Sequence, residues 1–191
     1  MNSINDTRSQ ILDTAQDILQ RQSISGVSFQ DLADRIGIKK GSMYYHFKSK
    51  DDLSIAILER ASEDMSQALQ RGHSKTASAQ LHYFIGIFRS FMGQCEKICP
   101  GGAFAGVWDK LNEPVQREVG KLINLQLKGV QHIINTGLES GEFDSHGQTS
   151  EALAQWVIDN IQGALLTSRI TKNPHSFEGS MKVLTEYLLK H

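Results

Sequence analysis

The chain has 191 residues, of which 39% are hydrophobic, and a formal net charge of −1. This length allows one large domain or two small ones with a real core. No apolar run approaches the roughly 20 residues of a membrane span, and the polar start MNSINDTRSQ has no apolar signal region, so we expect a cytoplasmic protein with no membrane partner. The two cysteines provide no disulfide framework.

The first predicted element is a helix from Asp6 or Thr7 to about Gln22. It has no chemical motif, so we expect it to buttress the elements that follow. Its amphipathic stripe contains Ile11, Leu12, Ala15, Ile18 and Leu19.

The next stretch, SFQDLADRIGIKKGSMYYHFKSKDDL, predicts two short helices joined by a tight turn and then the start of a longer helix. Ser28, with Asp31 three residues on, is a capping signal for the first helix. Gly37 suits the left-handed backbone at its end. In the second helix, Lys39 to Phe47, we expect Met43 and Phe47 to point inward. Ser49 followed by Asp52 is a second capping signal.

The polar side of the second helix suits contact with DNA, because a helix-turn-helix holds one helix rigidly for entry into the major groove. Lysines neutralise phosphates, small residues permit close approach, and tyrosine and histidine hydrogen-bond phosphate oxygens. The alternative is a helical hairpin whose polar face is merely solvated. The candidate DNA-binding residues are Ser28, Lys39, Lys40, Gly41, Ser42, Tyr44, Tyr45, His46 and Lys50.

The net charge of the chain argues against nucleic-acid binding, but the distribution of its charges does not. Lys39, Lys40, Lys48 and Lys50 cluster around the second helix. A local basic patch is enough for phosphate contact on a neutral protein. We therefore expect modest, salt-sensitive non-specific binding.

The segment Thr7 to Leu53 resembles the DNA-binding domain of the TetR family of bacterial repressors, above all in the run KKGSMYYHFKSKDDL. Ser28 and Met43 are mild variants of the family pattern. The resemblance covers about a quarter of the chain. It implies a three-helix DNA-binding domain at 1–50 and a helical ligand-binding and dimerisation domain at 51–191. The matching residues are Ile11, Leu12, Ala15, Gly26, Ser28, Leu32, Ala33, Gly37, Ile38, Lys40, Gly41, Ser42, Tyr44, His46, Phe47, Ser49, Lys50 and Leu53.

The helix that begins at Lys50 is predicted to reach about Arg71, and Gly72 to Ser78 is a turn-rich break. A more aromatic helix follows, from about Ala77 to Glu96. Its wide apolar face, including Phe88, is either core or the lining of a ligand cavity, and the two roles are compatible.

The segment CEKICPGGAFAGVWDKLN breaks this helix, and a short helix with Phe104 and Trp108 is predicted after the break. Some TetR relatives carry a cysteine at this junction, and some of those sense electrophiles or oxidants. Cys99 is at the matching place. A cysteine near a helix N-terminus can be reactive, whereas the alternative is a small buried hydrophobe.

A long helix is predicted from Asn112-Glu-Pro to about Ser140, apolar on more than one side and so central to the bundle. Gln126 lies within it and can meet a ligand, solvent or a neighbour. The candidate ligand-binding residues are Phe88, Cys99, Phe104, Trp108, Gln126 and Trp156, which suit a small, largely apolar effector.

Two amphipathic helices end the chain, capped at Thr149 or Ser150 and at Asn173-Pro174. The resemblance implies that they pair with a second copy in a four-helix interface, which would let a short reading helix recognise a palindrome twice. The alternative is packing within one chain alone. The candidate interface residues are Trp156, Ile161, Ala164, Leu165, Met181, Leu184 and Leu188.

No glycine-rich phosphate loop, zinc-type cysteine spacing or HExxH is present, and the seven histidines are scattered, so we expect no enzyme, cofactor or metal site. The function that we predict is a DNA-binding regulator, most simply a repressor, released from a palindromic operator by a small molecule. One alternative is the same regulator switched by oxidation or alkylation of Cys99. Another is a helical carrier or enzyme with a relic DNA-binding head.

Overall fold

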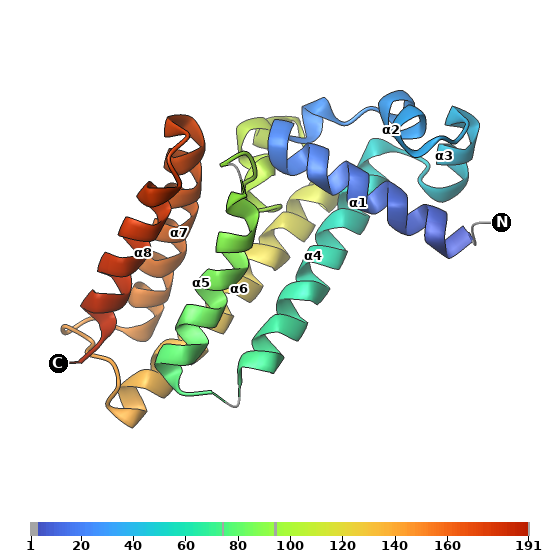
Figure 1. Cartoon of the computed structure of the whole chain (residues 1–191). Helices are drawn as coiled ribbons and strands as arrows, with labels where there is room; N and C mark the ends of the chain where they lie inside the picture. The colour runs from blue at the N-terminus through green and yellow to red at the C-terminus, as the bar shows by residue number, and fades with distance from the viewer. Residues whose placement is uncertain (1–3, 74, 94, 191) are drawn as a thin grey trace. The chain divides into compact units, whose positions relative to one another are not determined.

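The computed structural model describes residues 4–73, 75–93 and 95–190 (Figure 1). Among them there is no β-strand, and a single isolated bridge joins Phe143 to Leu189, so the predicted all-α fold is confirmed. None of the helices in these ranges has the length and apolar character to cross a membrane. The elements are α1 (Ile4–Gln22), α2 (Phe29–Ile36), α3 (Lys40–His46), α4 (Lys50–Gly72), α5 (Ala77–Met92), α6 (Glu113–Ser140), α7 (Ser150–Thr171) and α8 (Pro174–Leu188), with 3₁₀ segments η1 (Ile24–Gly26) and η2 (Gly102–Lys110).

The chain forms two compact units. The first contains residues 1–62 and 100–122, and the second contains residues 63–99 and 123–191. Helices α4 and α6 each contribute to both units. The predicted division of function at residue 50 stays a prediction. The break predicted at 72–78 coincides with the corner between α4 and α5, although residue 74 in it lies outside the described ranges.

The first unit is built on the apolar stripe of α1, which packs against η1 and α2 as expected. Helix α4 is tied to α1 by Arg60, whose guanidinium donates to Asp13 Oδ1 at 2.6 Å and to Gln16 Oε1 at 2.7 Å. The buried side chains of this unit include Ile11, Ala15, Leu19, Leu32, Ala33, Met43, Phe47, Leu53 and Ile57.

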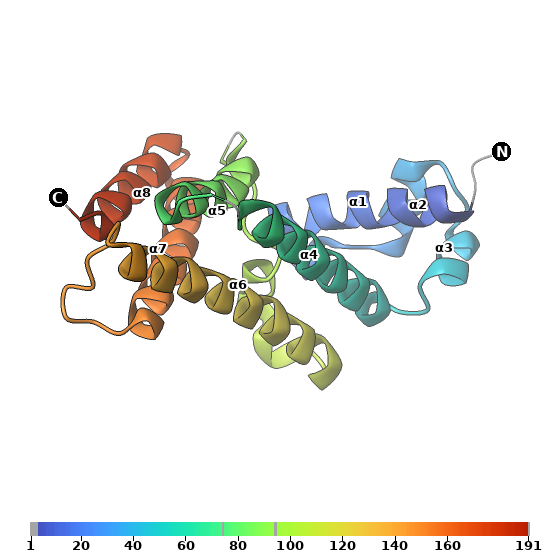
Figure 2. The same ribbon diagram turned by 90° about the horizontal axis from the view of Figure 1, so that it is seen from below.

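In the second unit α7 and α8 run side by side and α5 packs against both (Figures 1 and 2). On the surface, Arg89 of α5 donates two hydrogen bonds to the Glu178 carboxylate of α8, at 2.7 and 2.9 Å. Each fully buried apolar side chain stabilises the fold by about 1.5–3 kcal/mol relative to exposure, so the interior dominates the stability. It includes Phe84, Phe88, Val157, Ile161, Phe177, Leu184 and Leu188.

Around the cysteines one predicted boundary is wrong, and one predicted short helix is present but of the 3₁₀ type. Helix α5 ends at Met92, not near Glu96, because Gly93 (φ 40°) and Cys95 (φ 60°) take left-handed backbone conformations that end a helix. The short helix expected after Pro100 is the 3₁₀ segment η2, with non-helical backbone at Val107. Cys99 lies just before η2.

Candidate nucleic-acid interface

Helix α2 and the turn after it form as the sequence predicts. The Ser28 hydroxyl accepts a hydrogen bond from the Asp31 N–H at 3.4 Å and caps the N-terminus of α2. At the other end Gly37 adopts φ 77°, and both its N–H and that of Ile38 donate to the Ala33 carbonyl. This paired arrangement satisfies the end of the helix and reverses the chain into α3.

Helix α3 is anchored on one side and free on the other. Met43 is fully buried and Phe47 is 3% exposed, so both point inward as predicted. Tyr45 is 73% exposed and Tyr44 is 51% exposed, although the Tyr44 ring also packs against Phe29 at 5.2 Å. The helix therefore presents tyrosines outward from a rigid base.

A shallow, open hollow of about 500 Å³ lies beside α3. The structure brings four of the predicted DNA-binding residues together around it: Ser28, Lys40, Tyr44 and Lys50. Lys39, Gly41, Ser42, Tyr45 and His46 are not among its lining residues. The lining also includes Ser25, Gln30 and Lys48, which the predicted site omits. The positions of Ser25 in η1 and of Gln30 at the start of α2 could not be read from helix periodicity, whereas Lys48 belongs to the basic cluster seen in the sequence.

The N-terminus of α4 lies at one end of the hollow beside α3 and is capped by side chains. The Ser49 hydroxyl accepts from the Asp52 N–H at 3.0 Å, and the Asp52 carboxylate accepts from the Lys48 N–H at 3.1 Å, as the second capping signal predicts. Lys50 is exposed, yet its ammonium lies 3.4 Å from the Ile24 carbonyl of η1. Lys50 therefore has a structural contact in addition to its predicted one.

Neither the packing around Gly41 nor its backbone conformation requires glycine at this position. A Cβ built on it meets nothing within 4 Å, and its φ is not positive. Glycine in a helix costs up to about 1 kcal/mol relative to alanine. The bare backbone at this exposed position therefore suits close approach by another molecule.

The predicted ligand-binding residues are divided between the two units. Phe104 is buried and Trp108 is 42% exposed, both in the first unit. In the second unit the Gln126 amide donates to Cys99 Sγ at 3.6 Å, and both side chains are buried. Gln126 Oε1 has no hydrogen-bond partner there. Phe88 packs between Phe84 and Phe91.

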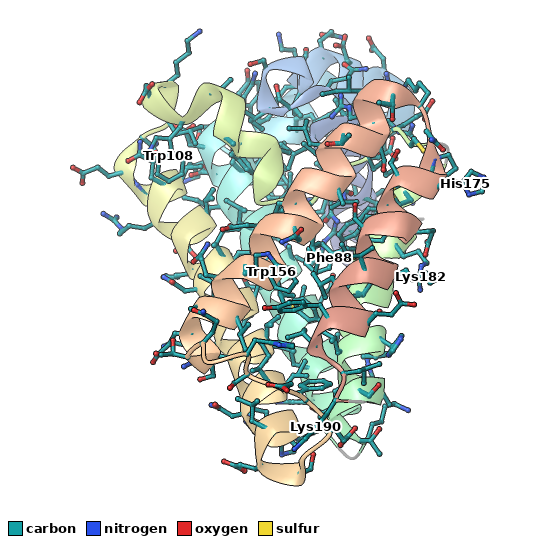
Figure 3. All side chains as sticks on the ribbon, turned by 90° about the vertical axis from the view of Figure 1, so that its left-hand side faces the viewer. Phe88, Trp108, Trp156, His175, Lys182 and Lys190 are labelled. Atoms are coloured by element: carbon teal, nitrogen blue, oxygen red, sulfur yellow. The ribbon has the colours of Figure 1, made fainter. Side chains whose placement is uncertain are left out.

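Most of the predicted interface residues are buried inside one chain: Ile161, Ala164, Leu165, Met181, Leu184 and Leu188. The exposed apolar side chains of α7 and α8 are Leu166, Ile170, Val183 and Tyr187, and the last packs against predicted interface residue Trp156 at 5.2 Å. The same two helices line an open groove of about 360 Å³. Figure 3 looks onto this face, with Trp156 on α7 and Lys182 on α8.

The groove is lined by small and polar side chains. Gly163 and Thr167 contribute from α7, and Ser176 and Ser180 contribute from α8. We call the surface formed by these residues and by Leu166, Ile170, Val183 and Tyr187 the α7–α8 face.

A capped α2, a glycine turn and an anchored α3 with an exposed polar side define a helix-turn-helix DNA-binding protein. Residues 11–57 match the family described as bacterial regulatory proteins, tetR family. The repressor DhaR of Mycobacterium sp. (strain GP1) is 25% identical over 186 residues, which are 95% of this chain and 92% of DhaR. The transcriptional repressor NemR of Escherichia coli (strain K12) is 24% identical over 85% of this chain and 86% of its own.

Solved structures have the same fold. A TetR transcriptional regulator from Legionella pneumophila is 25% identical with a TM-score of 0.84, and the match covers 98% of each chain. The reduced form of E. coli NemR has a TM-score of 0.82 at 20% identity, over 97% of this chain and 100% of NemR. Residues 11–57 therefore form a DNA-binding domain of the tetR type, and the chain as a whole is similar in sequence and fold to TetR-family transcriptional regulators.

Proposed function

We propose that this regulator acts as a homodimeric repressor that occupies a palindromic operator and leaves it when a small molecule binds. In this proposal residues 1–50 read the DNA, while residues 51–191 bind the effector and the second subunit. Release requires that the effector bind more tightly to the conformation that does not fit the operator.

The observation that carries the DNA-binding surface is the two-sided character of α3. Its inward side is locked by Met43 and Phe47, whereas Tyr45 projects into solvent beside exposed Lys39 and Lys40. Because Met43 and Phe47 fix α3 in the core, Tyr45 can contact DNA without a rearrangement of the helix. The two lysines supply positive charge for phosphates.

The operator proposal is tested by a gel shift with Tyr45→Ala and Lys50→Ala on the DNA upstream of the protein's own gene, in excess competitor DNA. We expect each variant to lose about tenfold in affinity, since one contact to DNA contributes about 1–3 kcal/mol. Lys50→Ala should also lower the slope of log affinity against log salt by about 1.

Tyr83→Ala and Lys128→Ala, at exposed positions of α5 and α6, are the matched controls and should bind as the parent does. Because Lys50 also contacts the Ile24 carbonyl, circular dichroism must establish that its variant is folded. Unchanged operator binding by both folded variants would show that α3 and the N-terminus of α4 do not contact DNA. Weak, sequence-independent binding by the parent together with turnover of a substrate would instead favour a helical enzyme or carrier.

The effector proposal rests on the buried pair Cys99 and Gln126. The free Oε1 of Gln126 is a hydrogen-bond acceptor in apolar surroundings, where an unpaired polar atom is costly. A largely apolar effector with one N–H or O–H donor would satisfy it. We expect Gln126→Leu to bind operator normally but to lose release by an effector found by screening on the gel shift. If the effector releases Gln126→Leu from operator at the same effector concentration as it releases the parent, Gln126 does not bind the effector.

A second candidate switch is the thiol of Cys99, because the Gln126 amide already points a donor at its sulfur. NemR, whose reduced form has a known structure, shares the fold of this chain. Cys99 is fully buried, so oxidation or alkylation requires local opening. Peroxide or N-ethylmaleimide would release the parent and Cys95→Ser from operator but not Cys99→Ser. Equal release of Cys99→Ser would reject this candidate.

The dimer proposal uses the α7–α8 face rather than the residues buried beneath it. Exposed Leu166, Ile170 and Val183 offer apolar area, and the small residues of the groove let a partner helix come close. Of the predicted interface residues that are buried in one chain, Ala164 also lines this groove.

A further inference from the structure

Two histidines that are 59 residues apart in the sequence meet at the surface of the second unit. The Nε2 of His132 lies 3.3 Å from the Nδ1 of His73, with ring centroids 5.0 Å apart and ring planes inclined by 40°. His73 directly follows α4, and His132 lies in α6. Both side chains are exposed, so solutes can reach the two facing nitrogens.

The separation of these nitrogens suits a shared metal ion. Zinc binds histidine nitrogen at about 2.0–2.1 Å, and two tetrahedral ligands at that distance have nitrogens about 3.3–3.4 Å apart. The observed 3.3 Å therefore matches the spacing of a chelate. Small rotations of the exposed rings turn the two lone pairs toward one point between them. Imidazole prefers zinc, nickel and copper over magnesium and calcium.

We propose that His73 and His132 form a two-histidine chelate for a divalent transition-metal ion, completed by water. His73 binds through Nδ1 and His132 through Nε2. The proton that the two rings share in the hydrogen bond moves through solvent to the other nitrogen of its own ring, which leaves a lone pair on each facing nitrogen for the metal ion. The sequence alone does not predict this site, because neither histidine belongs to a short-range metal-binding motif.

The chelate differs from a structural metal centre. Among the residues that the structure describes, no group of three or more His, Cys, Asp or Glu side chains is arranged for a metal. Two protein ligands and water give exchangeable binding, which would replace the hydrogen bond between the end of α4 and α6 by a metal link while metal is present. The alternative is that the pair is no more than an imidazole–imidazole hydrogen bond. This inference does not depend on the identity of the effector or the operator.

The test is titration of the full chain, prepared without a histidine tag, with nickel chloride by calorimetry. We expect one ion per chain, and a weakening of at least about tenfold in His73→Gln and in His132→Gln because each variant keeps one ligand. His175→Gln, an exposed histidine at the start of α8 that Figure 3 labels, should bind nickel as the parent does. Parent-like binding by both site variants, or loss in His175→Gln, would overturn the proposal.

A stability measurement separates the chelate from a simple hydrogen bond. At a nickel concentration tenfold above Kd, the parent Tm should rise by about 3 °C, and magnesium should have no effect. The rise should vanish in His132→Gln even if the Tm of that variant without metal is lower. With copper, electron paramagnetic resonance should report two nitrogen ligands in the parent and one in His132→Gln. No metal-dependent rise in the parent, or the same spectrum in both proteins, would leave only the hydrogen bond.

Discussion

At the scale of single residues, the half-buried Glu142 joins the loop after α6 to the start of α5. Its two carboxylate oxygens accept hydrogen bonds from the Ala77 and Ser78 N–H groups, each at 3.0 Å, and one also accepts from the Ser140 hydroxyl at 3.1 Å. Thr76 caps the next N–H of α5, that of Ala79. The first turn of α5 is therefore satisfied by side chains, one of them from the loop after α6.

These contacts give Glu142 a pH-dependent effect on stability. The Ser78 N–H first, then the Ala77 N–H, lower the pKa of Glu142 below its ordinary value of 4.5, against a smaller opposing effect of burial. A carboxylate with a lowered folded-state pKa stabilises the protein above its unfolded pKa, and this stabilisation is lost as pH falls through the folded pKa. It is therefore fully present near neutral pH.

Glu142→Gln should lower the Tm by a few degrees near neutral pH, and the difference from the parent should shrink as pH falls below 4.5 and through the lowered pKa of the folded-state carboxylate. Thermal unfolding at several pH values measures this. Glu151→Gln, at an exposed carboxylate in the first turn of α7, is the control. If the Tm difference between parent and variant does not change with pH, packing rather than the charge of Glu142 holds the loop after α6 to α5.

At the scale of elements, the end of α6 is shaped by a close approach between a helix and its own following loop. Phe143 folds back so that its ring lies on Gly137, and its N–H donates to the Gly137 carbonyl at 3.0 Å. A Cβ on Gly137 would be 2.1 Å from Phe143 Cδ2, and the ring is 3% exposed. The ring cannot move aside without leaving the core.

Gly137→Ala should therefore destabilise the protein by about 1–3 kcal/mol through overpacking, despite the better helix propensity of alanine. Denaturant unfolding measures the effect. Gly120→Ala is the matched control in the same helix, because its Cβ meets nothing within 4 Å and alanine should stabilise by up to about 1 kcal/mol. Two variants with the same sign of effect would contradict this account of the α6 end.

At the scale of the whole molecule, the α7–α8 face makes the dimer proposal testable by one added side chain. A Cβ at Gly163 meets nothing within 4 Å, so a larger residue fits one chain but blocks the groove to a second. Gly163→Leu should fold as the parent does and run as a monomer in light scattering after size-exclusion chromatography. Glu151→Leu, exposed at the start of α7, should remain dimeric. A dimeric Gly163→Leu would place the interface elsewhere.

Much of the fold was predictable because its signals are local. Ser28, Gly37, Thr149 and Asn173 cap or end helices where the sequence places them, and the apolar stripes mark the buried faces. The end of α5 was missed because Gly93, the residue that ends the helix, was not read as a stop, and the positive φ at Cys95 has no reliable sequence signal.

The candidate sites were less predictable because they depend on which surface is left over after the chain has packed. Apolar periodicity on α7 and α8 identified Ile161 and Leu184, which form the core of one chain. The predicted interface left out Gly163 and Ser180, two small residues that line the open groove. The meeting of His73 and His132 depends on how the corner after α4 packs on α6, which no local pattern encodes.

The groove in the α7–α8 face also bears on fidelity among related proteins. A cell that holds two regulators of one fold must keep their subunits from mixing, since a mixed dimer would join two unrelated half-sites. Affinity for the right partner is not enough, because discrimination also needs a clash with the wrong one. In the proposed dimer, a groove lined by Gly163 would accept a partner whose opposing surface fills it and would exclude one with a bulky residue at the corresponding position. A few side chains at positions 163, 176 and 180 would then decide which subunits pair, independently of the residues that read DNA.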